Sequence, residues 1–125
     1  MKQEIKEMEI NGIIYIPKGS VELTKAESKD GMPYVMIRTY SAGVHCGYLK
    51  SREGKEVILL DSIRIWKWSG SASLSQLAME GTNDAPNCKF GMPISTQLIL
   101  TEAIEVIEMT GLAKQSIQNV ASWKA

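Results

Sequence analysis

The chain has 125 residues, 44% of them hydrophobic, and its fourteen acidic residues balance fourteen lysines and arginines. This length suffices for one hydrophobic core of ordinary size and is too short for two well-formed domains. The balanced charge argues against DNA as a partner, although net charge leaves a local basic patch open. No apolar run approaches the roughly 18 residues of a membrane span, and the N-terminal sequence MKQEIKEMEI lacks a signal-peptide pattern. We therefore expect a protein of the cytoplasm with no membrane partner.

The first third of the chain predicts a hairpin followed by a polar connection. Asn11-Gly12 lies between two apolar-rich runs, and both residues tolerate the positive φ angles of a two-residue hairpin turn. We expect an N-terminal hairpin over residues 5–17. The stretch 18–33 is the most polar of the chain and predicts a long loop, with one further strand at 20–24 as an alternative.

The middle of the chain predicts an antiparallel meander over residues 34–68. The segments are rich in β-branched and aromatic residues and are separated by turn-forming residues, including Gly43. The expected strands are Tyr34–Tyr40, Val44–Lys50 and Glu56–Trp68.

A short helix and a long loop follow the meander. Ser73 and Gln76 have the spacing of a capping box, and Gly81 fits the position that ends a helix, so we expect a helix at 74–80. Two prolines and a glycine then disfavour regular structure over 82–95. Loops of this length in compact domains are often functional, so we interpret 82–95 as a lid.

The last part of the chain is ambiguous in one segment. We favour a strand at 97–107, bulged near Glu102-Ala103, and a helix remains an alternative for 101–108. Thr110 is expected to cap a final helix at 111–120. The whole pattern predicts an α+β fold, namely a single domain with a twisted antiparallel sheet and two short helices.

The residues give little support to metal binding or covalent catalysis. His45 is the sole histidine, and no metal-ligand spacing occurs around it. Cys46 is its neighbour, and adjacent strand residues point to opposite faces, so the two cannot form a catalytic pair. We expect no catalytic group, no metal and no cofactor. Cys46 and Cys88 fit free thiols in a reducing compartment, with a disulfide as the less favoured alternative.

The tract RIWKW carries the strongest signal for a ligand. In a regular strand Arg64, Trp66 and Trp68 share a face, and Arg38 and Tyr40 share a face of a nearby strand. Arginines supply planar donors for phosphate, and aromatic rings stack on bases, so this set suits a nucleotide. The alternative is that both tryptophans are core or subunit-interface anchors.

Five sequence blocks resemble a family of small phage proteins. RTYSAGVHCG, GKEV, RIWKWSG, LSQLAMEG and ILTEAIEVI occur in the order and at the approximate spacing found in that family. Some members resemble the first type of Thoeris anti-defence protein. The resemblance implies a sponge that binds a cyclised ADP-ribose isomer made by bacterial TIR-domain enzymes without cleaving it. It also implies a homo-oligomer, a dimer or a dimer-based assembly, with pockets between subunits, cyclic oligonucleotides as further ligands, and action in the host bacterial cytoplasm.

Matched block by block, the resemblance makes Arg38 to Gly43 a pocket-forming segment whose small residues let backbone N–H groups reach a phosphate. Ile63 stands where the family often has a further arginine, which removes one expected phosphate contact. The lid assignment comes from this chain's own 82–95 loop. The candidate ligand-binding residues are Arg38, Tyr40, Ser41, Ala42, Gly43, Arg64, Trp66, Trp68, Asn87, Phe90 and Met92. Two other functions remain open, namely an enzyme that degrades a nucleotide signal and a module that binds a host protein.

Overall fold

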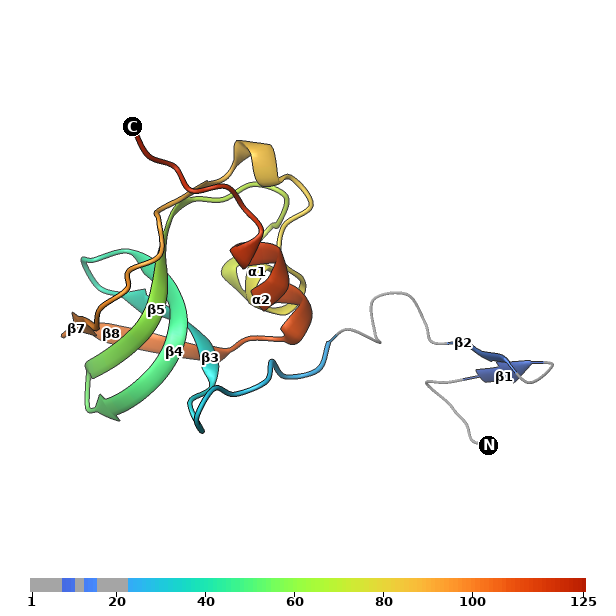
Figure 1. Cartoon of the computed structure of the whole chain (residues 1–125), viewed down its shortest axis with the longest axis horizontal. Coiled ribbons are helices and arrows are strands. Elements are labelled where there is room, and N and C mark those ends of the chain that lie inside the picture. The colour runs from blue at the N-terminus through green and yellow to red at the C-terminus, as the bar shows by residue number, and fades with distance from the viewer. Residues whose placement is uncertain (1–7, 11–12, 16–22) are drawn as a thin grey trace.

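The fold is described from a computed structural model, in which residues 8–10, 13–15 and 23–125 are placed (Figure 1). None of the helices in these ranges is long and apolar enough to cross a membrane. The elements are β1 (Met8–Ile10), β2 (Ile13–Tyr15), β3 (Tyr34–Thr39), β4 (Val44–Glu53), β5 (Glu56–Lys67), α1 (Leu74–Glu80), the 3-10 turn η1 (Ala85–Asn87), β6 (Lys89–Phe90), β7 (Leu98–Leu100), β8 (Ala103–Glu108) and α2 (Gly111–Gln118).

The N-terminal hairpin consists of β1 and β2, which pair antiparallel. Ile10 lies opposite Ile13, so two residues connect the strands, as the Asn11-Gly12 pattern predicts. The predicted hairpin extends to 5–7 and 16–17, which lie outside the described residues. The alternative strand at 20–24 also falls largely outside them.

The main sheet has the strand order β6-β5-β4-β3-β8, and β7 pairs with β5 as well. All of these pairings are antiparallel, and the predicted α+β fold, a single small domain with one antiparallel sheet and two helices, is confirmed. Only Thr101 and Glu102 separate β7 from β8, although the two strands pair with β5 and β3 respectively. The sheet therefore curls, and the Thr101-Glu102 corner connects β7, on the β5 side of the sheet, to β8, at the opposite edge beside β3 (Figure 1).

This corner corrects the prediction of one strand at 97–107. The chain turns at Thr101-Glu102, and the pairing of β8 with β3 shifts register between Glu105 and Ala103, beside the position of the predicted bulge. The set of residues that faces inward therefore changes across this corner. Leu100 and Ala103 are buried, whereas Ile104, which the single strand would turn inward, is 47% exposed. Within 101–108 the structure is a strand and not a helix.

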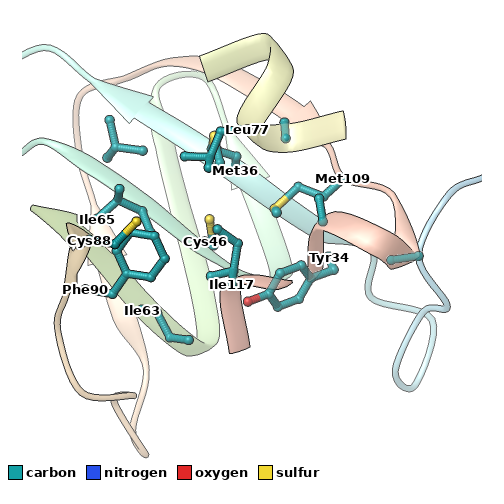
Figure 2. Packing of buried hydrophobic residues seen from close by; sticks show 14 of the residues in the cluster. Tyr34, Met36, Cys46, Ile63, Ile65, Leu77, Cys88, Phe90, Met109 and Ile117 are labelled. Carbon is teal, nitrogen blue, oxygen red and sulfur yellow. The ribbon is translucent and has the colours of Figure 1, made fainter. Parts of the chain in front are cut away.

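Two apolar clusters fill the two faces of the curled sheet. The inner cluster consists of Val35, Ile37, Val57, Leu59, Leu100 and Ala103. The helix-facing cluster lies between the sheet and the two helices, as Figure 2 shows, and includes Tyr34, Met36, Cys46, Leu77, Phe90 and Ile117. Burial of these side chains, at roughly 1.5–3 kcal/mol for each large residue, stabilises a sheet whose strands alternate between the two clusters.

The two helices begin at the caps that the sequence predicts. The Ser73 hydroxyl accepts a hydrogen bond from the Gln76 N–H at 3.1 Å, and Gly81 ends α1 with a φ of 76°. The Thr110 hydroxyl accepts from the Ala113 N–H and also donates to the Met79 carbonyl of α1. One side chain thus caps α2 and joins it to α1, and α2 ends at Gln118, two residues before the predicted end at 120.

Candidate functional site

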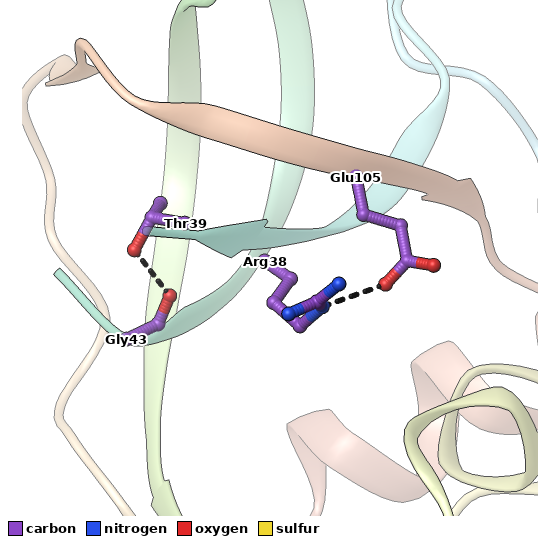
Figure 3. Close-up of polar contacts among 4 residues, drawn as sticks. All are labelled: Arg38, Thr39, Gly43 and Glu105. Atoms are coloured by element: carbon purple, nitrogen blue, oxygen red, sulfur yellow. Dashed lines mark hydrogen bonds and ion pairs between the residues drawn. The ribbon is translucent and has the colours of Figure 1, made fainter. Parts of the chain in front are cut away.

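Arg38 lies on β3 and is already paired within the protein. Its Nε donates to the Glu105 carboxylate of β8 at 3.0 Å (Figure 3). Both side chains are about half exposed, at 48% and 45%. Because an acidic group shares this position, a phosphate approaching Arg38 would also meet a like charge.

The turn Ser41–Gly43 is held by its own hydrogen bonds. Thr39 Oγ1 donates to the Gly43 carbonyl at 2.7 Å (Figure 3) and accepts from the Ala42 N–H at 2.8 Å. The Ser41 hydroxyl donates to the Glu102 carboxylate, and the Tyr40 N–H donates to the Glu102 carbonyl. The prediction of a bare Ser41–Gly43 backbone is therefore wrong for the Ala42 N–H group, which donates within the fold.

His45 is buried directly behind this turn. Its Nε2 lies 2.9 Å from the Ala42 carbonyl, which only accepts, so Nε2 carries the proton. Nδ1 is then an acceptor, and it has no hydrogen-bond partner among the described residues. Burial lowers the pKa of His45, and the positive charge of the nearby Arg64 guanidinium lowers it as well. The hydrogen bond to the Ala42 carbonyl raises the pKa, but by less than burial lowers it. A neutral imidazole thus positions the Ser41–Gly43 turn.

Cys46, the residue after His45, belongs to the helix-facing cluster (Figure 2). Burial raises the pKa of its thiol far above the usual range. A thiol that stays protonated at neutral pH is a poor nucleophile. The structure therefore offers no reactive pair at His45–Cys46.

The sheet register separates the two predicted arginines. Arg38 lies opposite Val44, and Val44 lies opposite Ile65, so these three side chains share the helix-facing side. Arg64 lies opposite His45 and therefore points to the other face. The two arginines therefore lie on opposite faces of the sheet within one protomer.

Arg64 instead forms part of an exposed aromatic and basic group. Its guanidinium lies 4.8 Å from the centroid of the Trp66 ring, and the Trp66 ring contacts the Trp123 ring edge to face at 6.3 Å. Lys89 Nζ lies 5.0 Å from the Trp123 centroid. We call these four residues, Arg64, Trp66, Lys89 and Trp123, the indole cluster.

Backbone hydrogen bonds hold the strands under the indole cluster. The Gly91 N–H donates to the Arg64 carbonyl at 2.8 Å, and the Trp123 N–H donates to the Phe90 carbonyl at 2.8 Å. Trp66 and Trp123 remain 57% and 52% exposed, so both rings are available to a ligand. Beside Trp123 lies an open hollow of about 340 Å³, lined by Trp123, Lys124 and Ala125.

Two predicted site residues belong to the core. Phe90 is 1% exposed and packs in the helix-facing cluster, so it cannot close over a ligand. Trp68 packs against the same cluster, because β5 ends at Lys67 and the alternation of faces stops there. Trp66 and Trp68 therefore do not share a face as predicted.

The segment 82–95, which the sequence predicts to be a lid, is hydrogen-bonded to β5 and to the residues that follow it. The Asp84 carboxylate accepts from the Ser69 hydroxyl at 2.7 Å, and the Ile94 N–H donates to the Ser62 carbonyl. Asn87 donates to Asp84 at 3.0 Å, and with the Ser69 hydroxyl it lowers the pKa of that carboxyl. Of the predicted lid residues, Met92 is exposed, at 57%, one residue after Gly91.

The residues that complete the indole cluster, Lys89 and Trp123, are absent from the sequence prediction. Trp123 lies 57 positions after Trp66, so no local spacing indicates the contact. A weak signal does exist, because the stretches 62–79, 85–101 and 109–125 contain no acidic residue. These three stretches meet at the indole cluster and give it a positive local charge on a neutral chain.

A family model described as "Domain of unknown function (DUF6948)" matches residues 32–117. The chain belongs to the DUF6948 family. The DUF6948 region contains Arg64, Trp66 and Lys89, whereas Trp123 comes from the segment after it. No curated protein and no solved structure matches the chain.

Proposed function

We propose that this DUF6948 protein is a phage or prophage anti-defence protein that acts as a sponge. It binds a cyclised ADP-ribose isomer (glycocyclic ADP-ribose) made by bacterial TIR-domain enzymes and holds it without cleaving it. Thoeris-type defence is then blocked, because its effector receives no signal. The proposal joins the five resembling sequence blocks to the chemistry of the indole cluster.

The observation that carries the proposal is the contact of two exposed indoles with two cations. An indole face can stack on adenine, and Arg64 can donate two parallel hydrogen bonds to a phosphate. Lys89 adds a second positive charge near Trp123, within reach of a pyrophosphate. A nucleotide signal needs these two kinds of contact together.

We further propose that a second subunit completes the site in a homo-oligomer in the host bacterial cytoplasm. Small-molecule sites commonly bury about 70–90% of their ligand. In one protomer Trp66 and Trp123 are each more than half exposed, so a ligand on them keeps one side open to water. A partner subunit over the indole cluster would supply the missing cover.

Sequestration fits the described residues better than degradation does. An enzyme that cleaves the signal needs an acid and a base at the bound ligand. His45 is buried and bonded to the Ala42 carbonyl, and Cys46 lies on the opposite face. The indole cluster itself contributes only cations and indoles.

A host-protein interaction module is the second candidate function. Trp66, Met92 and Trp123 are large and exposed, the two indole rings contact each other, and Met92 follows Gly91, which lies beside Trp66. Tryptophan is common in the hot spots of protein interfaces. This candidate predicts capture of a protein partner and no retention of a nucleotide. The same preparation can test both.

The deciding experiment mixes purified protein with the product of a TIR-domain enzyme, removes free ligand by filtration and denatures the protein by heat. Mass spectrometry then identifies what is released. We expect intact cyclised ADP-ribose from the wild type and at least about a tenfold loss of retention for Trp66→Ala. Ile99→Ala, which removes an apolar side chain that is 50% exposed on β7, outside the indole cluster and outside the candidate ligand-binding residues, is the control. Release of a cleaved product, or equal loss in both variants, would contradict the proposal.

A further inference from the structure

We infer that the indole cluster and its neighbouring lysines bind single-stranded nucleic acid through stacked bases and backbone phosphates. This inference goes beyond the proposed signal binding and depends only on the geometry and charge of the surface. Its experimental outcome is therefore separate from that of the sponge proposal.

The first step is the repeated pairing of a ring with a cation. Trp66 has Arg64 at 4.8 Å from its ring centroid, and Trp123 has Lys89 at 5.0 Å. The ring centroids are 6.3 Å apart, and the rings are inclined by 73°. Two platforms, each with its own cation, match a strand in which bases and phosphates alternate.

The second step is the local charge. Lys67 ends β5 beside Trp66, and Lys124 follows Trp123, so two further exposed cations flank the indole cluster. The three chain stretches that meet here, 62–79, 85–101 and 109–125, contain no acidic residue. The acidic residues Glu102, Glu105 and Glu108 instead lie on or beside β8, which pairs with β3. The indole cluster is therefore locally positive although the chain as a whole carries no net charge.

The third step is the open shape of the surface. Trp66 and Trp123 are both more than half exposed, and the hollow beside them is lined only by Trp123, Lys124 and Ala125 among the described residues. An open aromatic and basic surface suits an extended strand, because successive bases stack on it without enclosure. A duplex fits poorly, because its base faces are already stacked on one another.

The test is quenching of tryptophan fluorescence by uridine and thymidine single strands of about ten nucleotides, a length within the known range of such sites. Trp68 is half-buried against the helix-facing cluster, so quenching reports on Trp66 and Trp123. We expect both strands to quench and a duplex of the same length to bind at least about tenfold more weakly. Quenching by one strand type alone would assign the surface to RNA or to DNA. Absence of quenching by either strand, or equal affinity for the duplex, would overturn the inference.

Charge-reversal variants separate this surface from general electrostatic attraction. Lys89→Glu removes a cation of the indole cluster, whereas Lys50→Glu makes the same charge change towards the other end of the β4–β5 hairpin. We expect Lys89→Glu to weaken binding about tenfold and to flatten the salt dependence by about 0.7 in its logarithmic slope. Lys50→Glu should change affinity less than about twofold. Equal effects of the two variants would contradict a defined site.

Discussion

Two segments of this DUF6948 protein, each containing an arginine, are both predicted from the sequence to bind a ligand. The folded structure gives them different surroundings. Arg38 stands before the Ser41–Gly43 turn, and its guanidinium is paired with the Glu105 carboxylate. Arg64 stands two strands further along, on β5, and lies over an exposed indole. The first segment directs its polar groups at acidic and carbonyl groups of the fold, whereas the second places a partly buried guanidinium, which has no acidic partner among the described residues, beside an indole ring that is 57% exposed.

The difference arises from the partners that the sheet brings to each arginine. β8 places Glu105 beside Arg38, and Glu102, just before β8, accepts from Ser41 of the turn. The C-terminal segment instead places Trp123 beside Trp66, and Lys89 of β6 lies over the Trp123 ring. A residue type alone therefore does not identify a binding site. An arginine is a candidate ligand-binding residue when the neighbouring strands supply no acidic hydrogen-bond partner for its guanidinium.

The largest expected effect comes from the residue that lies under the indole cluster. Phe90→Ala removes a ring that is 1% exposed, so we expect a loss of about 3–5 kcal/mol in the free energy of unfolding. Met92→Ala, two residues later and exposed, should change it by less than about 0.5 kcal/mol. Urea denaturation of both variants checks this contrast. A Phe90→Ala protein as stable as the wild type would contradict the assignment of Phe90 to the helix-facing cluster.

A second effect should appear on acidification, through His45 behind the Ser41–Gly43 turn. Its pKa is lowered in the folded state, so the unfolded chain binds the proton more readily. The contribution is fully present above the ordinary histidine pKa of about 6.5 and is lost as the pH falls from there through the lower folded pKa. His45→Gln, which retains a donor for the Ala42 carbonyl, should show a smaller loss of unfolding free energy between about pH 7 and pH 5. If urea denaturation shows the same pH dependence of the unfolding free energy in His45→Gln and in the wild type, His45 is not the source of the acid destabilisation.

The smallest expected effect concerns the ion pair of the first segment. Glu105→Gln removes the partner of Arg38, and both side chains are about half exposed to solvent. We expect the unfolding free energy to fall by less than about 1 kcal/mol, because solvent screens the pair. Retention of the nucleotide signal should stay unchanged. A marked rise in retention would show that Arg38, once released, is a ligand-binding group.

Local chemistry made much of the fold predictable. The Ser73 cap, the Thr110 cap and the β3–β5 meander depend on residues close together in the sequence, and each is found where its pattern lies. The β7–β8 corner could not be predicted in this way. It exists because the two strands pair with opposite edges of the sheet, which no local pattern at Thr101-Glu102 encodes.

The candidate site was predictable only in part, for the same physical reason. The alternation of strand residues correctly grouped Arg64 with Trp66, but it failed for Trp68, where β5 has ended. The separation of Arg38 from Arg64 depends on the register of β4 between them. Lys89 and Trp123 belong to the indole cluster through contacts between segments far apart in the sequence. The absence of acidic residues from the stretches 62–79, 85–101 and 109–125 was the one sequence feature that indicated a common basic surface.

The most direct test of the account compares Arg64→Ala with Arg38→Ala in retention of the cyclised ADP-ribose signal. Both variants remove one guanidinium from neighbouring parts of the sheet, and circular dichroism establishes that both are folded. We predict that Arg64→Ala loses at least about tenfold in retention, as expected when a charged hydrogen bond to phosphate is removed, while Arg38→Ala stays within about twofold of the wild type. If Arg38→Ala loses the signal and Arg64→Ala keeps it, the indole cluster is not the binding site and the segment from Arg38 to Gly43 is.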